Sequence, residues 1–186
     1  MLEVELKSVV DDVPARRAAV EAAGGTLVFE GRLLDQRYDL ADRSMLLRDH
    51  VLRLRVYETL DLRQGYLDWK GETRYEDGFK LRDEVSTPVD DPAAFATILD
   101  RLGYVVTSEI DRQIAQYELA GATVRFEEYP EMDPLVEVEG SPEEIEKAIS
   151  LMGMSRVGFT SERLLEFATR YEARTGRRAI LGRLPA

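Results

Sequence analysis

The sequence predicts one α+β domain, in which antiparallel strands close into a barrel with charged side chains inside and amphipathic helices outside. Two kinds of pattern lead to this expectation. Several segments alternate between apolar and charged residues, as strands with two unlike faces do. Other segments have apolar residues at helical spacing and end at glycine, as amphipathic helices do. With 186 residues the chain can bury a single core, which we assign to residues 1–176, followed by a C-terminal tail over residues 177–186.

Helices and strands follow one another in an order that suits a mixed fold. Proline in Ser141-Pro142 favours the start of a helix, and Asp77-Gly78 is typical of a tight hairpin between two strands. The expected helices are residues 13–23, 92–102, 142–152 and 161–175. The expected strands are residues 3–7, 26–29, 33–40, 52–56, 66–70, 79–87, 109–119, 123–128 and 135–139.

Composition excludes several classes of function. A net charge of −11 argues against a nucleic-acid partner or an anionic membrane, because both attract positive surfaces. The chain has no cysteine, which excludes thiol catalysis and disulfide bonds and gives no support to an oxidising compartment. No secretory leader pattern and no apolar run of membrane-spanning length is present. We therefore expect a cytoplasmic protein without a membrane partner.

Five of the expected strands carry their charged side chains on one face. In the first strand, Glu3, Glu5 and Lys7 alternate with apolar residues. The other four charged faces consist of Arg53 with Arg55, Lys80 with Arg82 and Glu84, Arg125 with Glu127, and Glu137 with Glu139. One such strand is typical of an ordinary half-exposed sheet. Five of them, with carboxylates on some strands and Lys or Arg on others, favour a barrel whose charged faces point inward.

An interior lined with charges is costly unless a ligand and metal ions neutralise it. Glutamate oxygens suit Mg²⁺ or Mn²⁺, whereas zinc would bring cysteine or more histidine than His50, which is expected in a loop. The candidate metal ligands are Glu3, Glu5, Glu127, Glu137 and Glu139. The candidate phosphate-binding cations are Lys7, Arg53, Arg55, Lys70, Lys80, Arg82 and Arg112. Without a glycine-rich phosphate loop, phosphate binding must come from these side chains.

The opening Glu3-Xaa-Glu5-Xaa-Lys7 resembles the signature of the CYTH superfamily, the triphosphate tunnel metalloenzymes. Further motifs stand in the order of that family over residues 1–170. They are Asp35-Xaa-Arg37-Tyr38-Asp39, Leu52-Arg53-Leu54-Arg55, Trp69-Lys70-Gly71, Arg82-Xaa-Glu84, Arg112 and Val136-Glu137-Val138-Glu139. The resemblance implies an eight-stranded antiparallel tunnel in which basic side chains hold a triphosphate.

The resemblance also implies roles for single residues. The metal would be held by the paired glutamates of the first and last strands, Glu3 with Glu5 and Glu137 with Glu139. Glu127 stands where the family more often has aspartate, which leaves its role open. Two further departures, Glu131-Met132-Asp133-Pro134 and Ser161-Glu162, replace a glycine-rich turn and a Ser-Tyr pair. They are expected to affect the rim of the tunnel and the choice of substrate.

Three functions are compatible with these residues. The favoured hypothesis is a metal-dependent triphosphatase, in which Lys7, Arg53, Arg55, Lys70 and Arg82 neutralise the phosphates while water attacks the terminal phosphorus. The alternatives are an adenylyl cyclase that converts ATP to cyclic AMP, and a non-catalytic binding module. Tyr66 and Trp69 could stack on a base, but core packing is the more common role of such residues. The sequence leaves open whether the substrate is inorganic triphosphate, thiamine triphosphate or ATP, and whether the protein is a homodimer.

Overall fold

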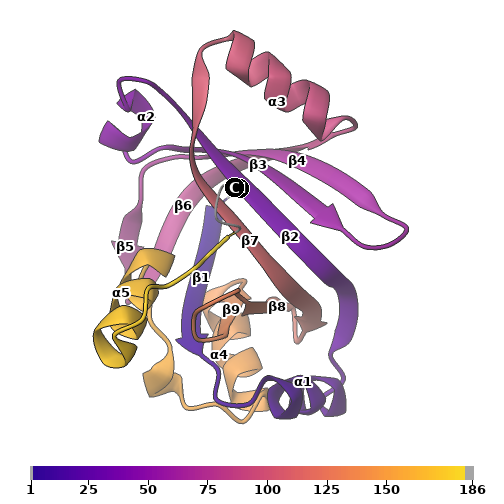
Figure 1. The fold of residues 1–186 in the computed structure, drawn as a ribbon. Helices are drawn as coiled ribbons and strands as arrows, with labels where there is room; N and C mark the ends of the chain where they lie inside the picture. The colour runs from indigo at the N-terminus through magenta and orange to yellow at the C-terminus, as the bar shows by residue number, and fades with distance from the viewer. Residues whose placement is uncertain (1, 183–186) are drawn as a thin grey trace.

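The backbone forms a closed β-barrel with helices on its outside (Figure 1). The computed structural model describes residues 2–182, and the side chains of residues 4–182. Nine strands form one antiparallel sheet in the order β1-β9-β8-β7-β2-β3-β4-β6-β5, and pairing of β1 with β6 closes it. Strand β5 extends the β6 edge and stands outside this ring, so eight strands make the barrel. The predicted α+β class and the antiparallel tunnel of eight strands are confirmed.

Most of the predicted elements are present, with longer strands than expected. The strands are β1 (Leu2–Val9), β2 (Thr26–Leu40), β3 (Val51–Glu58), β4 (Arg63–Lys70), β5 (Arg74–Glu76), β6 (Phe79–Val89), β7 (Tyr104–Leu119), β8 (Ala122–Glu128) and β9 (Leu135–Glu139). The helices are α1 (Val13–Ala22), α2 (Ser44–Leu47), α3 (Pro92–Arg101), α4 (Pro142–Leu151) and α5 (Leu164–Thr175). Two expected strands, 26–29 and 33–40, form the single long strand β2. Within residues 2–182, no helix is long and apolar enough to cross a membrane.

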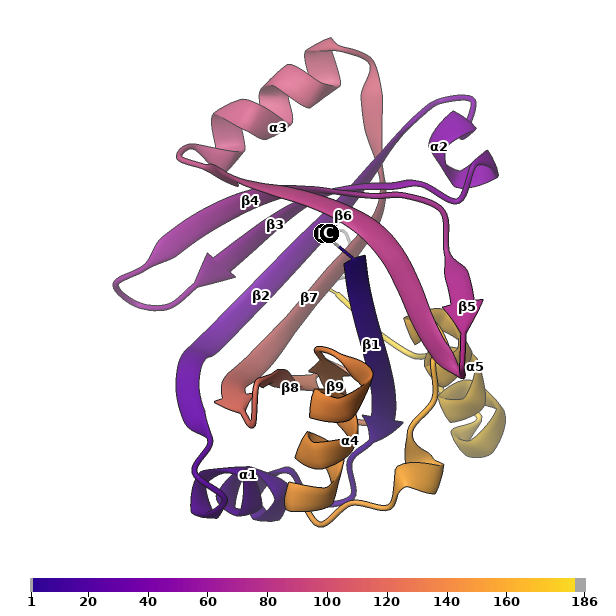
Figure 2. The same ribbon diagram turned by 180° about the vertical axis from the view of Figure 1, so that it is seen from behind.

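The apolar faces of the strands point outward and are covered by helices. Helix α4 begins with a capping box at Ser141 and Glu144 and contacts β1, β8 and β9. Its Ile145 packs in one cluster with Leu6 and Phe126, which are almost inaccessible to solvent. On the other half of the barrel, α3 covers β3, β4 and β7 (Figures 1 and 2). Burying the outer apolar face under helices leaves the charged face inside.

Helix α5 lies at one end of the barrel interior. Its Phe167 packs in a cluster with Leu135, which stands two residues before Glu137 and therefore shares the inward face of β9. The segment after α5 returns to the barrel, where the main-chain carbonyl of Leu181 accepts a hydrogen bond from the N–H of Asp111. Apolar side chains of α5 and of this segment thus close the end of the barrel at which β9 begins.

We expect Leu6→Ala to destabilise the fold much more than Leu60→Ala. The Leu6 side chain is fully buried between the sheet and the helices that cover it. Its truncation leaves a cavity and should lower the free energy of unfolding by about 3 kcal/mol. Leu60 is fully exposed, and its truncation should change that free energy by less than about 0.5 kcal/mol. Urea unfolding followed by circular dichroism measures both values. Equal effects of the two substitutions would contradict the proposed core.

Candidate active site

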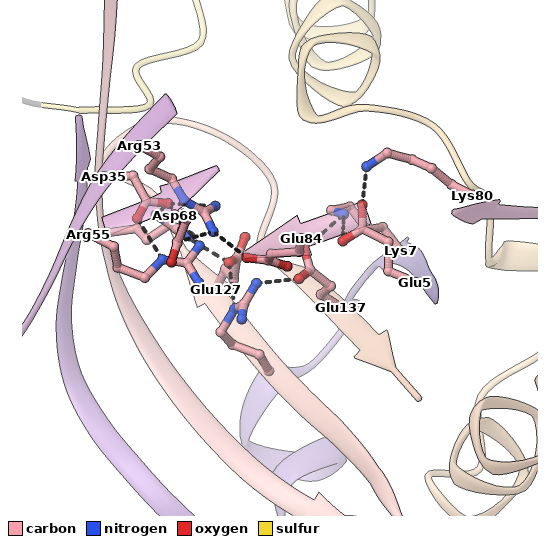
Figure 3. A network of polar contacts seen from close by, with 12 residues as sticks. Glu5, Lys7, Asp35, Arg53, Arg55, Asp68, Lys80, Glu84, Glu127 and Glu137 are labelled. Atoms are coloured by element: carbon pink, nitrogen blue, oxygen red, sulfur yellow. Dashed lines mark hydrogen bonds and ion pairs between the residues drawn. The ribbon is translucent and has the colours of Figure 1, made fainter. Parts of the chain in front are cut away.

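Charged side chains from every strand of the closed barrel meet in its interior and form a continuous set of ion pairs, which we call the girdle (Figure 3). The girdle residues are Glu5, Lys7, Asp35, Arg53, Arg55, Asp68, Lys70, Lys80, Glu84, Arg112, Arg125, Glu127 and Glu137. They occupy alternating positions of their strands, opposite the apolar outer face. The interior therefore holds positive and negative groups in close alternation.

Lys7 connects the two strands that were predicted to bind the metal. Its Nζ lies 2.7 Å from Glu5 Oε2 and 2.8 Å from Glu137 Oε2. The second oxygen of Glu5 pairs with Lys80, and the second oxygen of Glu137 pairs with Arg125. Burial alone would raise the pKa of Glu5, but mainly the ammonium of Lys7, with help from Lys80, lowers that pKa to about 2. Both carboxylates are therefore ionised at neutral pH.

Asp35 is a second centre of the girdle, on β2. Its carboxylate accepts a hydrogen bond of 2.8 Å from Arg55 Nε, and Arg112 Nη1 lies 3.1 Å away. Arg112 also donates a 3.0 Å hydrogen bond to Glu127, which joins this centre to β8. Burial opposes the ionised form of Asp35, yet the arginines, Arg55 first, hold its pKa well below the usual range.

Two of the predicted phosphate-binding residues have additional contacts at the rim of the barrel. Lys70 Nζ lies 3.2 Å from Glu84 Oε2. Arg82 Nε donates a 2.8 Å hydrogen bond to the main-chain carbonyl of Gly71, and its guanidinium also donates to the carbonyl of Asp49. Arg82 therefore holds the loop after β4 against the loop before β3, in addition to any role in binding phosphate.

The structure brings most of the predicted site residues into one network. The girdle contains Lys7, Arg53, Arg55, Lys70, Lys80, Arg112, Glu5, Glu127 and Glu137. Arg82 is buried on β6 between Lys80 and Glu84, on the same face. Glu139 is half-buried and lies opposite Glu5 in the pairing of β1 with β9. The main chain of Glu3 pairs with Arg82, whereas its side chain lies outside the described residues.

Sequence reasoning did not include Asp35, Arg37, Asp68 and Arg125 among the site residues. Asp35 and Arg37 stand two apart on β2, and Arg125 stands two before Glu127, so a same-face spacing could have indicated them. On β2 that signal is weakened because apolar residues occur on both faces of the strand. Asp68 pairs with Arg53 at 2.7 Å and stands two residues before Lys70 on β4, so the same spacing could have indicated it as well.

Arg37 differs from the cations of the girdle. It lies directly opposite Arg53 in the pairing of β2 with β3, and within residues 4–182 its guanidinium makes no ion pair with a carboxylate. Part of this side chain is exposed to solvent. Desolvation of the remainder, followed by the positive charge of Arg53, lowers the pKa of Arg37. Like charges on directly opposed residues destabilise a sheet. An anion between the two arginines would remove this repulsion.

Comparison with known proteins identifies the family. The model of the CYTH domain matches residues 1–152, which is most of the chain. The chain belongs to the CYTH domain family. A search of curated proteins finds no match in sequence.

Solved structures share the fold of this CYTH domain. A putative adenylate cyclase from Vibrio parahaemolyticus is 17% identical with a TM-score of 0.75, and the match covers 91% of this chain and 98% of that one. A conserved hypothetical protein from Pyrococcus furiosus is 21% identical with a TM-score of 0.71, over 89% and 99% of the two chains. A Hippeastrum protein, described as a putative adenylyl cyclase with a dominant triphosphatase activity, is 16% identical with a TM-score of 0.62, over 97% and 98%. At such low sequence identities, the structural similarity shows a shared fold alone.

The donor set of the CYTH domain fits a hard divalent cation. Glu5, Glu127 and Glu137 offer only carboxylate oxygens, the ligands that Mg²⁺ and Mn²⁺ prefer. Among the described side chains, no three acidic or histidine groups converge as a ready-made metal cage, because cations of the girdle separate them. Lys7 itself bridges Glu5 and Glu137. A metal ion would share these two carboxylates with Lys7 or take its place.

The girdle should make the stability of this CYTH domain depend on pH. Because the folded-state pKa of Glu5 is lowered from 4.5 to about 2 and that of Asp35 is lowered too, their stabilisation is present above the unfolded pKa and is lost as pH falls. We expect a constant melting temperature from about pH 8 to pH 5 and a steep fall from about pH 4 toward pH 2.

Asp35→Asn tests the contribution of one girdle carboxylate to this stability. At pH 7 it should cost about 3 kcal/mol, because it leaves buried arginines uncompensated, and it should flatten the acid-side fall of the melting temperature. Asp90→Asn, at an exposed position, is the matched control and should retain the wild-type profile. Scanning calorimetry across the pH range gives both results. Identical profiles for the two variants would contradict the role of Asp35.

Proposed function

We propose that this CYTH domain is a metal-dependent enzyme that hydrolyses a triphosphate inside its barrel. The girdle is the observation that supports this proposal most strongly. Its Lys and Arg side chains are held by carboxylates, and the same groups can bind phosphate oxygens. Its glutamates can bind a divalent cation. A structural core gains little from such a set, since buried ion pairs are often no more stabilising than apolar residues of similar size.

Exchange of partners explains how the girdle accepts its ligand. In the structure, Lys7 is shared by Glu5 and Glu137, and Arg55 and Arg112 are held by Asp35. A triphosphate brings negative charge to the cations, and the accompanying metal brings positive charge to the glutamates. Each buried charge then has a partner before and after binding. The binding energy must exceed the cost of separating the internal pairs, which favours a ligand of high charge such as a triphosphate.

The reacting phosphoryl group would be stabilised by charges that are already in position. Lys7, Arg53, Arg55 and Lys70 would hold the non-bridging oxygens, on which charge spreads in the transition state. Glu5, Glu137 and Glu139, with Glu3, would hold Mg²⁺ or Mn²⁺. When bound, the metal supplies Lewis-acid polarisation of the phosphate oxygens. Preorganised charges of this kind need no reorganisation at the moment of reaction.

The products that form show which of the three functions the protein has. The protein is incubated with inorganic triphosphate, thiamine triphosphate or ATP, in the presence of Mg²⁺ or Mn²⁺, and orthophosphate, pyrophosphate and cyclic AMP are assayed. Triphosphatase activity gives orthophosphate and is lost when EDTA removes the metal. Cyclic AMP with pyrophosphate would instead identify a cyclase. Tight binding without any product would identify a binding module.

Glu137→Gln should reduce triphosphate hydrolysis by about a hundredfold or more, because it removes a charge that holds the metal and positions Lys7 and Arg125. The matched control is Glu128→Gln on the neighbouring strand β8, where the side chain is exposed and lies outside the girdle. The control should retain full activity. Initial rates of phosphate release at saturating metal measure both variants, and equal rates would contradict the assignment of Glu137.

Arg37→Leu should weaken substrate binding more than turnover. Its guanidinium is accessible and opposite Arg53, so we expect it to bind the outer part of the phosphate chain and to contribute about tenfold to KM. Arg101→Leu, an exposed change at the end of α3, is the control and should leave KM unaltered. The values of kcat and KM for inorganic triphosphate separate the two effects. An unchanged KM in Arg37→Leu would show that the phosphates do not reach this residue.

A further inference from the structure

The carboxylate of Glu127, which lies within the girdle (Figure 3), accepts hydrogen bonds from several buried donors. Arg112 Nε and Arg125 Nε each donate to Oε1 at 3.0 Å, and the hydroxyl of Tyr129 donates to Oε2. The donors and the carboxylate are all buried. An ionised carboxylate has about four acceptor sites, so these donors occupy most of them. Little of this carboxylate is left for a metal ion.

The donors to Glu127 differ in chemistry from those of Glu5 and Glu137. Glu5 is held by Lys7 and Lys80, and Glu137 shares Lys7. A lysine ammonium is a point charge on a flexible stem, and a metal ion can take its place. An arginine guanidinium is planar and donates in fixed directions, and its displacement would leave a buried charge unpaired. Exchange with a metal ion is therefore easier at Glu5 and Glu137 than at Glu127.

Strand register places apolar residues on both sides of Glu127. It lies opposite Ile114 on β7 and opposite Leu135 on β9, and both of these side chains are buried. The pairing of β1 with β9 instead sets Glu5 directly opposite Glu139. Side chains that stand directly opposite each other on one face of a sheet are close neighbours. The register therefore favours a metal ion between β1 and β9.

Tyr129 connects Glu127 to the closed end of the barrel. Its ring packs in one cluster with Leu135 and with Phe167 of α5, while its hydroxyl donates to Glu127 in the girdle. A buried tyrosine hydroxyl needs a hydrogen-bond partner, and the Glu127 carboxylate supplies it. Packing of the ring under α5 thus helps to fix the position of this carboxylate.

Arg112 keeps a donor for a further ligand. Its Nε is engaged by Glu127, and its Nη1 lies 3.1 Å from Asp35. Even so, Nη1 is buried and makes no hydrogen bond with the described residues. A buried donor without a hydrogen-bond partner is costly and rare in folded proteins. A phosphate oxygen can accept this bond while Glu127 holds the guanidinium in its orientation.

We propose that Glu127 is a positioning residue and not a metal ligand, and that with the Tyr129 hydroxyl it orients Arg112 and Arg125 toward the phosphates of the substrate. This inference rests on the proposed function, in which a triphosphate occupies the girdle. Glu127, which the sequence placed among the metal ligands, serves the phosphate-binding arginines instead. The metal ion is left to the glutamates of β1 and β9.

Two binding measurements test this assignment. Mn²⁺ alone is titrated and followed by electron paramagnetic resonance, and inorganic triphosphate is titrated by calorimetry in EDTA, where no metal ion supports turnover. Tyr129→Phe removes the hydroxyl but keeps the packed ring and the net charge. We expect it to weaken triphosphate binding by about fivefold and to change the affinity for Mn²⁺ by less than about twofold.

Tyr171→Phe is the matched control, because it removes a hydroxyl from the same apolar cluster. That hydroxyl donates to Glu131 at 2.9 Å, outside the girdle, and its loss should alter neither affinity. Glu127→Gln should leave the affinity for Mn²⁺ within about threefold, whereas Glu137→Gln should weaken it by about tenfold or more. Circular dichroism checks the folding of each variant, and Tyr129→Phe decides the question if Glu127→Gln does not fold.

The outcomes distinguish this inference from the proposed function. If Glu127 binds the metal ion, Tyr129→Phe frees one of its oxygens and should raise the affinity for Mn²⁺, and Glu127→Gln should lower it as much as Glu137→Gln does. Either result, or triphosphate binding that is absent from the wild type or unchanged in Tyr129→Phe, would overturn the assignment and leave the triphosphatase proposal to its own test. The expected affinities in a protein that hydrolyses no triphosphate would overturn the triphosphatase proposal and leave the role of Glu127 in phosphate binding intact.

Discussion

The contact of Lys7 with Glu5 and Glu137 is the interaction on which the rest of the barrel interior depends. Ionised groups can remain inside a protein only if partners repay the cost of removing them from water. Here each of the two carboxylates has a cation on both oxygens, and Lys7 is common to the two. The same alternation continues through Arg125 and around the barrel (Figure 3). A charged interior is thereby compatible with a stable fold.

This interior reverses the usual arrangement of a small barrel. Since the strands turn their charges inward, their apolar faces point outward and must be covered. Helices α1 and α4 lie over one half and α3 over the other (Figure 1). The hydrophobic core is therefore a layer between sheet and helices, while the inside of the sheet is left for polar chemistry. Stability and function occupy opposite faces of the same strands.

The two ends of the barrel have different chemistry. At one end, Phe167 of α5 packs with inward apolar residues such as Leu135, and the segment after α5 adds to this closure. At the other end, the rings of Phe29, Tyr57 and Tyr66 and the side chain of Gln116 are half-buried beside the girdle. The two ends of the interior are therefore not equivalent, unlike those of a uniformly charged tunnel.

The sequence determined the features that depend on neighbouring residues. Alternation along β1 separated Glu5 and Lys7 from Leu6, and Asp77-Gly78 marked the hairpin between β5 and β6, because strand faces and tight turns follow from local backbone geometry. Helix starts were also close, although α5 begins at Leu164 rather than at Ser161.

Tertiary structure decided which charges meet. Asp35 and Arg112 are distant in the chain, and only the pairing of β2 with β7 and the closure of β1 on β6 bring the girdle together. That Arg37 makes no ion pair with a carboxylate of residues 4–182 likewise depends on what lies across the strands, where Arg53 stands directly opposite. The sequence could list the charged residues, but their pairing is a property of strand register and closure, which no local pattern contains.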